Sequence, residues 1–156
     1  MHPNEALILQ LYTGLQNLDG EAMGACYHPQ AQFSDPVFPD LHGKAVGGMW
    51  RMLCQSATDL SVSFRDIRAN DNTGQGYVEA VYTFSTGRKV HNSIASRFEF
   101  LDGKIIRQKD DFNFWRWSRM ALGMTGFLLG WTPWLQRKVQ KRAARQLERY
   151  LARKSV

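Results

Sequence analysis

One carboxylate stands in an unusual setting within residues 32–39, which read QFSDPVFP. The spacing places Asp35 near the end of a short strand that two prolines terminate. If apolar neighbours shield Asp35 from water, burial raises the pKa of its carboxyl group and makes it a proton carrier near neutral pH. The same letters also fit a strand followed by an ordinary Asp-Pro surface turn. Asp35 is therefore a candidate catalytic residue whose role depends on its enclosure.

His91 is a second candidate for proton transfer, because the pKa of an imidazole lies close to neutral pH. The alternative is an exposed or hydrogen-bonded structural histidine at the start of a strand. No glycine-rich phosphate loop is present, since Gly47 and Gly48 fall inside a helical pattern. We expect no metal and no cofactor. Neither the pair spacing nor the neighbouring carboxylates of a metal site accompany the histidines, which are His2, His28, His42 and His91.

The N-terminal part of the chain has mainly helical spacing. Asn4 is a suitable cap for a first helix whose apolar residues recur every three or four positions, and this spacing turns Tyr12 inward. Trp50 lies on the apolar face of a later helix, so we expect it in the core or lining a pocket. The predicted elements are helices over about 4–18, 21–27 and 44–57, with a short strand over about 31–37.

From Leu60 onward the apolar period changes to two, which indicates β-structure. The Asp102-Gly103 dipeptide is a strong two-residue turn signal, and a regular hairpin around it places Ala95 opposite Asp110. Helices followed by a run of strands form an α+β pattern. The predicted strands cover about 60–70, 76–86, 90–101 and 104–117.

The 156 residues suit one domain, and 44% of them are hydrophobic, enough for a proper core. The net charge of +6 is concentrated at one end: residues 1–136 carry −1, and residues 137–156 carry +7. A nearly neutral body argues against a specific nucleic-acid-binding core. Cys26 and Cys54 suggest neither a disulfide framework nor a zinc site, and the N-terminus lacks the features of a signal peptide. We therefore expect a cytoplasmic protein.

The tail combines an uncharged run with a basic helix. Residues 120–136 carry no charge, but three glycines and a proline interrupt this run, and it is short for a membrane span. A helix over about 134–153 follows. This basic helix could make weak contact with an anionic membrane surface, or pack on the domain or on a partner chain. Its apolar stripe consists of Leu135, Val139, Ala143, Leu147, Tyr150 and Leu151.

Two motifs and the order of the elements carry a resemblance to a known superfamily. The motifs are FSDPV at 33–37 and DGKII at 102–106. The pattern resembles the nuclear transport factor 2-like superfamily, and within it the ketosteroid isomerases and SnoaL-like polyketide cyclases, over roughly residues 4–117. This resemblance implies a cone-shaped α+β barrel in which a curved mixed or antiparallel sheet wraps around three N-terminal helices. The chain then divides into a domain over 1–118 and a C-terminal helical extension over 119–156.

The resemblance also implies roles for particular residues. Asp35 is similar to the isomerase base, and Tyr12 is similar to the tyrosine that donates a hydrogen bond to the developing enolate oxygen. The carboxylic acid that completes that oxyanion hole has no match, because its position falls near Ala95 or Ser96. Asp110 follows the DGKI turn where SnoaL-like proteins often carry an acidic residue. It either forms an acid and base pair with Asp35 or is ion-paired or solvated.

Two functions remain open at this point. The chain is either an enzyme of the isomerase, cyclase or hydrolase type that uses Asp35 for proton transfer on a small, largely apolar substrate, or a non-catalytic ligand-binding or assembly module. The resemblance also implies a homodimer formed through the sheet, which an exposed sheet face with Phe, Trp and Ile would support. The predicted site consists of the catalytic residues Asp35, Asp110 and His91 and the ligand-binding residues Tyr12, Phe33, Trp50 and Asn113.

Overall fold

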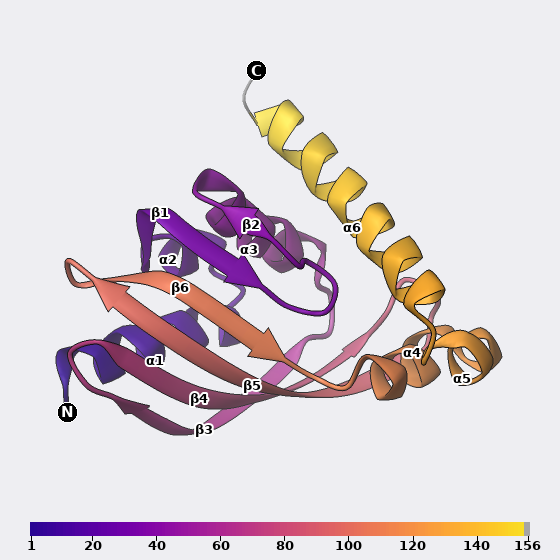
Figure 1. Cartoon of the computed structure of the whole chain (residues 1–156), viewed down its shortest axis with the longest axis horizontal. Coiled ribbons are helices and arrows are strands. Elements are labelled where there is room, and N and C mark those ends of the chain that lie inside the picture. Colours follow the sequence, from indigo (N-terminus) through magenta and orange to yellow (C-terminus); the bar gives the residue numbers. More distant parts are fainter. Residues whose placement is uncertain (155–156) are drawn as a thin grey trace.

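The structure, a computed structural model, describes residues 1–154 and consists of helices packed against a single β-sheet (Figure 1). The helices are α1 (Pro3–Gln16), α2 (Gly20–Gly24), α3 (Lys44–Ser56), α4 (Phe114–Leu122), α5 (Met124–Leu129) and α6 (Pro133–Lys154). The strands are β1 (Tyr27–Ser34), β2 (Leu41–His42), β3 (Ser61–Ala69), β4 (Thr73–Thr83), β5 (Lys89–Leu101) and β6 (Lys104–Asp111).

The six strands form one mixed sheet in the order β2-β1-β6-β5-β4-β3. β1 and β6 run parallel, whereas the other neighbouring strands are antiparallel. The predicted α+β fold with a curved mixed sheet is confirmed, although the sheet does not close into a barrel (Figure 1). The parallel contact brings the strand that ends before Asp35 against the last strand of the chain, far away in sequence.

The three N-terminal helices contribute apolar side chains to the main core, together with the strand positions that face them. In α1 and α3 the buried residues recur every three or four positions, and in β5 they alternate with exposed ones. Helical and strand periodicities therefore meet at one interface. Fully buried members of this core include Ile8, Leu11, Met23, Val46, Met49, Phe98 and Ile105.

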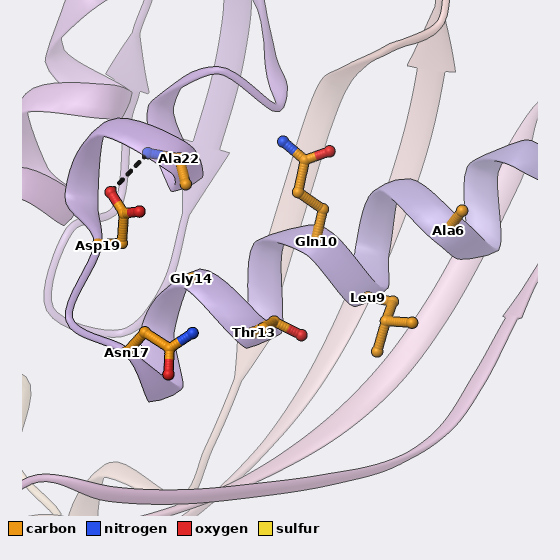
Figure 2. Close-up of a pocket in the computed structure, with 8 residues that line it drawn as sticks. All are labelled: Ala6, Leu9, Gln10, Thr13, Gly14, Asn17, Asp19 and Ala22. Atoms are coloured by element: carbon orange, nitrogen blue, oxygen red, sulfur yellow. Dashed lines mark hydrogen bonds between the residues drawn. The ribbon is translucent and has the colours of Figure 1, made fainter.

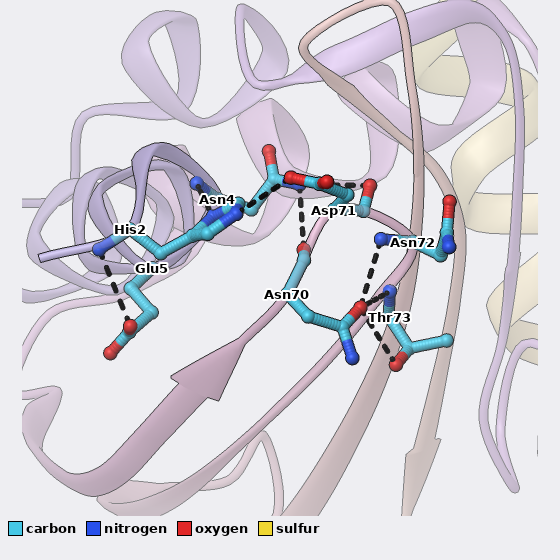
Figure 3. A network of polar contacts seen from close by, with 7 residues as sticks. All are labelled: His2, Asn4, Glu5, Asn70, Asp71, Asn72 and Thr73. Carbon is cyan, nitrogen blue, oxygen red and sulfur yellow. Dashed lines mark hydrogen bonds and ion pairs between the residues drawn. The ribbon is translucent and has the colours of Figure 1, made fainter.

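A polar network fixes the first turn of α1 to the turn between β3 and β4 (Figure 3). His2 caps the helix: its Nδ1 accepts a hydrogen bond from the Asn4 backbone N–H at 3.0 Å, and Glu5 Oε1 accepts one from the His2 backbone N–H. The predicted cap, Asn4, instead uses its side-chain amide to donate to the Asn70 carbonyl at 3.0 Å. His2 Nε2 lies 2.9 Å from Asp71 Oδ1. These contacts hold α1 across the sheet.

The last predicted strand was wrong in its second half. β6 stops at Asp111 and α4 begins at Phe114, because Asn113 Oδ1 accepts a hydrogen bond from the Arg116 backbone N–H and caps the helix. Phe114, Trp117 and Ala121 form one buried side of α4. They pack with Val90 of β5. Alternating aromatic residues are typical of a strand, but the same residues can also form the apolar stripe of a helix, which is why the strand was predicted.

α6 returns over α3, as Figure 1 shows, and the predicted stripe is confirmed. Leu147 and Tyr150 are buried, and Ala143 and Leu151 pack against the main core. The predicted boundary after residue 118 falls inside α4, and the division of the chain remains a prediction. Within residues 1–154, no helix is both long enough and apolar enough to cross a bilayer.

Candidate functional site

Asp35 directly follows β1, and Asp110 lies on the neighbouring strand β6. In the parallel pair formed by β1 and β6, Phe33 is the register partner of Gln108 and Ser34 that of Lys109; Asp35 and Asp110 are the next residues of the two segments. Because side chains alternate along a strand, the Asp110 carboxyl group is on the face of Gln108, and the Asp35 carboxyl group is close enough for its charge to raise the pKa of Asp110. Neighbouring strands are about 4.8 Å apart. The structure thus brings together two of the predicted catalytic residues.

The Asp35 carboxylate is held in a tight turn. Its Oδ1 accepts hydrogen bonds from the backbone N–H groups of Val37 at 2.7 Å and Phe38 at 2.6 Å, while the Asp35 N–H donates to the Phe38 carbonyl. Burial raises the pKa of Asp35 to about 6, although the two hydrogen bonds act in the opposite direction. This carboxyl group is therefore ordered and titrates near neutral pH.

α6 covers the turn that holds Asp35. The side-chain amides of Gln136 and Gln140 both donate to the Pro36 carbonyl, at 3.1 Å and 3.0 Å. These two glutamines are one helical turn apart, so both reach the same acceptor. The tail is consequently part of the surroundings of Asp35.

Asp110 stands at the end of a buried chain of hydrogen bonds. The Gln108 amide donates to Asp110 Oδ1 at 2.9 Å, and Gln108 Oε1 accepts a hydrogen bond from the Tyr27 hydroxyl. That hydroxyl in turn accepts one from the Trp50 indole N–H at 2.8 Å. Burial raises the pKa of Asp110 to about 7, and the charge of Asp35 adds to this, whereas hydrogen bonding lowers it. Trp50, predicted as ligand-binding, is the far end of this chain.

No cation balances the two carboxylates. Among residues 1–154, no Lys, Arg or His side chain lies within ion-pair distance of Asp35 or Asp110. Nor does the described part of the chain place three or more His, Cys, Asp or Glu side chains together as metal ligands. A buried carboxylate without a counter-ion is costly, so near neutral pH the pair is most stable when it holds one proton.

A buried row of polar groups continues from the pair across the sheet. Ser96 on β5 is the register partner of Asp110, and Gly76 on β4 is that of Ser96. Tyr12 occupies the space above Gly76, where an added Cβ would lie 2.5 Å from its hydroxyl. Among residues 1–154, neither the Tyr12 nor the Ser96 hydroxyl has a hydrogen-bond partner of standard geometry. Burial raises the pKa of Tyr12, and the charge of Asp110 raises it further, whereas the nearby Ser96 hydroxyl acts in the opposite direction.

The residue opposite Asp110 is Ser96, and the prediction of Ala95 was wrong. The β5–β6 hairpin has an irregularity between Glu99 and Phe100 that shifts its register by one residue. A one-residue shift moves every side chain to the other face. It therefore places the Ser96 hydroxyl, and not the Ala95 methyl group, beside the carboxyl group.

Two of the predicted site residues lie away from the pair. His91 is exposed on the opposite face of β5, with Nε2 at 2.6 Å from Glu79 Oε2, as expected of a structural histidine. Asn113 is exposed and caps α4, so it does not line the core. Phe33, in contrast, is buried and meets Trp50 edge-to-face with ring centroids 5.7 Å apart.

Three contributing residues escaped the sequence prediction. Gln108 and Ser96 are polar residues at buried strand positions, which a two-residue period would have identified had the bulge been known. Tyr27 was assigned to a helix but starts β1.

Two of the hollows on the surface are lined by neither Asp35 nor Asp110. One, of about 390 Å³, runs along α1 beside α2 (Figure 2). The other, of about 670 Å³, lies over β1, β2 and the β5–β6 hairpin. Close to the pair, core side chains such as Phe33, Phe38 and Trp50 fill the interior. A ligand that approaches the carboxyl groups from either hollow must therefore displace side chains or the turn beneath α6.

Comparison with known proteins places the sheet and the first three helices in a described group. The family model of the SnoaL-like domain matches residues 8–108. That range includes Asp35 and ends two residues before Asp110. No curated protein matches this sequence.

Solved structures share the fold at low sequence identity. An LEH-like epoxide hydrolase from M. tuberculosis has a TM-score of 0.65 and 17% identity, covering 81% of this chain and 96% of the hydrolase. TerC, co-crystallised with polyporic acid, has a TM-score of 0.65 and 17% identity, with coverage of 76% and 98%. An NTF2-like protein of unknown function from Burkholderia pseudomallei has a TM-score of 0.67 and 13% identity, with coverage of 77% and 98%.

Proposed function

Because the chain belongs to the SnoaL-like domain family, we propose that it is an enzyme of the isomerase, cyclase or hydrolase type. In this proposal Asp35 and Asp110 transfer protons on a small, largely apolar substrate. The observation that carries it is the closeness of the buried Asp110 carboxyl group to the half-buried Asp35, with no counter-ion for either among residues 1–154. A protein core gains nothing in stability from such a pair. Unpaired charged groups that break the usual rules of core composition are typical of functional sites.

The two carboxyl groups differ in a way that suits acid and base roles. Asp35 lies at the strand end, and two backbone N–H groups stabilise its charged form, so Asp35 is the base. Asp110 is more deeply buried, and the Asp35 charge further favours its protonated form, so Asp110 is the acid. A substrate between them loses a proton to Asp35 while Asp110 donates one to a developing oxyanion. Tyr12, further along the row, orients a polar substrate atom.

The apolar surroundings set the class of substrate. Phe33, Phe38 and Trp50 belong to the core next to the pair, and the polar groups that we assign to the substrate are those of the row from Asp35 to Tyr12. A compact hydrocarbon framework with one carbonyl or epoxide oxygen matches this arrangement. The epoxide hydrolase and the polyporic-acid complex among the similar structures support small-molecule chemistry on this fold.

A non-catalytic assembly module is the second candidate. The filled interior at the pair favours it, because a scaffold needs no open pocket. Homodimerisation through the sheet belongs to either candidate and stays a proposal. The sheet does not present the exposed apolar face that we expected, because Trp115 and Trp117 belong to α4. Its outer face carries mainly polar residues such as His91, Arg97 and Lys109. Sedimentation velocity over a wide concentration range tests the dimer.

Three simple probes test proton transfer without knowledge of the natural substrate. Deuterium uptake next to the carbonyl of cyclohexanone in D₂O reports base catalysis. Conversion of 3-cyclohexen-1-one to its conjugated isomer reports isomerisation, and diol formation from styrene oxide reports hydrolysis. We expect wild-type protein to accelerate at least one reaction above the protein-free rate, and Asp35→Asn to lower that rate about 100-fold or more, the usual contribution of a general base.

Asp111→Asn is the matched control, because Asp111 is the exposed neighbour of Asp110 on the other face of β6. It should retain the full rate. Folding of each variant is checked by circular dichroism. If folded wild-type protein accelerates none of the three probes, or if Asp35→Asn reacts as fast as Asp111→Asn, the enzyme proposal is overturned and the assembly module remains.

A further inference from the structure

The end of the molecule formed by α5 and the start of α6 exposes large apolar side chains. Five of them make up what we call the α5 surface, with exposed fractions between 51% and 73%. They lie within eleven consecutive residues, at the end of the molecule opposite the N-terminus in Figure 1. A surface of this kind in a folded domain usually marks a contact site. Its members are Met124, Phe127, Leu128, Trp131 and Trp134.

The outward face of α6 continues the α5 surface with positive charge. Residues Trp134, Lys138, Lys141 and Arg145 follow one another at helical spacing and are all exposed, whereas Leu147 on the opposite side is buried in the core. The α5 surface and this basic face therefore form one continuous strip.

The charge of α6 has no acidic partner within the protein. The helix carries eight Lys and Arg residues and one Glu, and among residues 1–154 none of the eight lies within ion-pair distance of a carboxylate. Lys138 also contacts the strip itself, with its Nζ 5.1 Å from the centre of the Trp134 ring. The positive field of α6 is thus directed outward, toward whatever binds there.

We propose that the α5 surface and the basic face of α6 dock on the surface of a lipid bilayer that contains anionic lipids. The Trp, Phe, Leu and Met side chains enter the boundary between headgroups and acyl chains, where tryptophan is favoured. Lys138, Lys141 and Arg145 meet the lipid phosphates. Each basic residue near such a surface strengthens binding about fivefold.

Charge complementarity favours this occupant over the others. A second copy of the chain, docked by the same surface around a two-fold axis, would bring two strongly basic helices together. A nucleic acid would match the charge, but it offers no apolar phase for Leu128, Met124 and Phe127. An anionic bilayer provides both an apolar phase and negative charge. The strip also lies beyond the matched family domain, which ends at residue 108, so the inference is independent of the proposed chemistry.

Sedimentation with vesicles tests the proposal on the full chain. The vesicles are pure phosphatidylcholine or a mixture of phosphatidylcholine with phosphatidylglycerol, each at low and moderate salt. We expect binding to the mixed vesicles that weakens with salt, and much weaker binding to the neutral ones. Lys138→Gln/Lys141→Gln/Arg145→Gln should weaken binding to the mixed vesicles about 100-fold. Leu128→Ser/Trp131→Ser should weaken it at least tenfold, with loss of the blue shift of tryptophan fluorescence.

Two matched controls separate the strip from general charge and apolarity. Arg68→Gln/Arg97→Gln/Lys109→Gln removes three exposed positive charges from the sheet, and Tyr77→Ser/Leu101→Ser removes two exposed apolar side chains there. Both should bind like wild-type protein. Absence of binding to mixed vesicles, or equal weakening by the control and strip variants, overturns the proposal. So does self-association that only the strip variants lose while no vesicle is bound.

Discussion

Replacement of Asp110 by Asn should stabilise the protein at alkaline pH while leaving it unchanged in acid. Asn is nearly isosteric, and its Oδ1 can still accept the hydrogen bond from Gln108. The pKa of Asp110 is about 7 in the folded protein, compared with an ordinary value of 3.8. Between about pH 4 and pH 7 the folded state keeps a proton that the unfolded state has released. The free energy of unfolding therefore falls as the pH rises through this range.

The size of the effect follows from the same two values. Their difference corresponds to about 4 kcal/mol in the free energy of unfolding. The wild-type protein shows this full loss of stability above about pH 7 and none of it below about pH 4. Urea unfolding of wild type, Asp110→Asn and Asp111→Asn at several pH values measures it. The difference between Asp110→Asn and wild type removes the contribution of histidines and exposed carboxylates common to both.

A pH-independent difference in unfolding free energy between wild type and Asp110→Asn would refute this reasoning. It would mean that Asp110 is hydrated or has a counter-ion in solution. The Asp35→Asn variant supplies a second check: removal of the Asp35 charge should lower the pKa of Asp110, and with it the upper end of the pH window.

Three further predictions concern the site and its surroundings. Catalysis of an active probe should have a bell-shaped pH dependence, rising as Asp35 ionises near pH 6 and falling as Asp110 ionises near pH 7, which initial rates would reveal. Gly76→Ala should lower the free energy of unfolding by about 1–3 kcal/mol, since a Cβ there meets Tyr12, and Tyr12→Phe should restore part of it because the closest contact is the Tyr12 hydroxyl. Gln136→Ala/Gln140→Ala should speed hydrogen exchange of the Val37 and Phe38 amides by loosening the turn, whereas Gln146→Ala on the exposed side of α6 should not.

The fold could be predicted in large part because its periodicities are clear. Apolar residues at helical spacing gave α1, α3 and α6, and the change of period at Leu60 gave the sheet. The parallel pairing of β1 with β6 was not predicted, since no local signal encodes contact between strands so far apart in sequence. The two-residue β2 is too short to produce a pattern. The end of β6 was missed because aromatic residues serve strands and helices equally well.

The site was accessible at the level of residue type and less so at the level of contacts. Asp35 and Asp110 were identified before the structure, one by its apolar setting and one by resemblance. The partners of Asp110 were not, because a single bulge at Glu99 and Phe100 decides that Ser96 and not Ala95 lies opposite. The position of His91 on the exposed face of β5, away from the pair, was missed for a related reason, because only the correct register shows which face of the strand it occupies.

The position of α6 connects the tail to the candidate site. One side of the helix binds the Pro36 carbonyl next to Asp35, and the opposite side carries the basic face of the proposed membrane contact. Because the same helix makes both contacts, we propose that a bilayer bound to the α5 surface shifts the Pro36 turn. If both proposals hold, mixed vesicles should raise the rate with an active probe in wild-type protein but not in Leu128→Ser/Trp131→Ser. An equal rise in both variants would show that the vesicles act on the probe and that α6 does not couple the two sites.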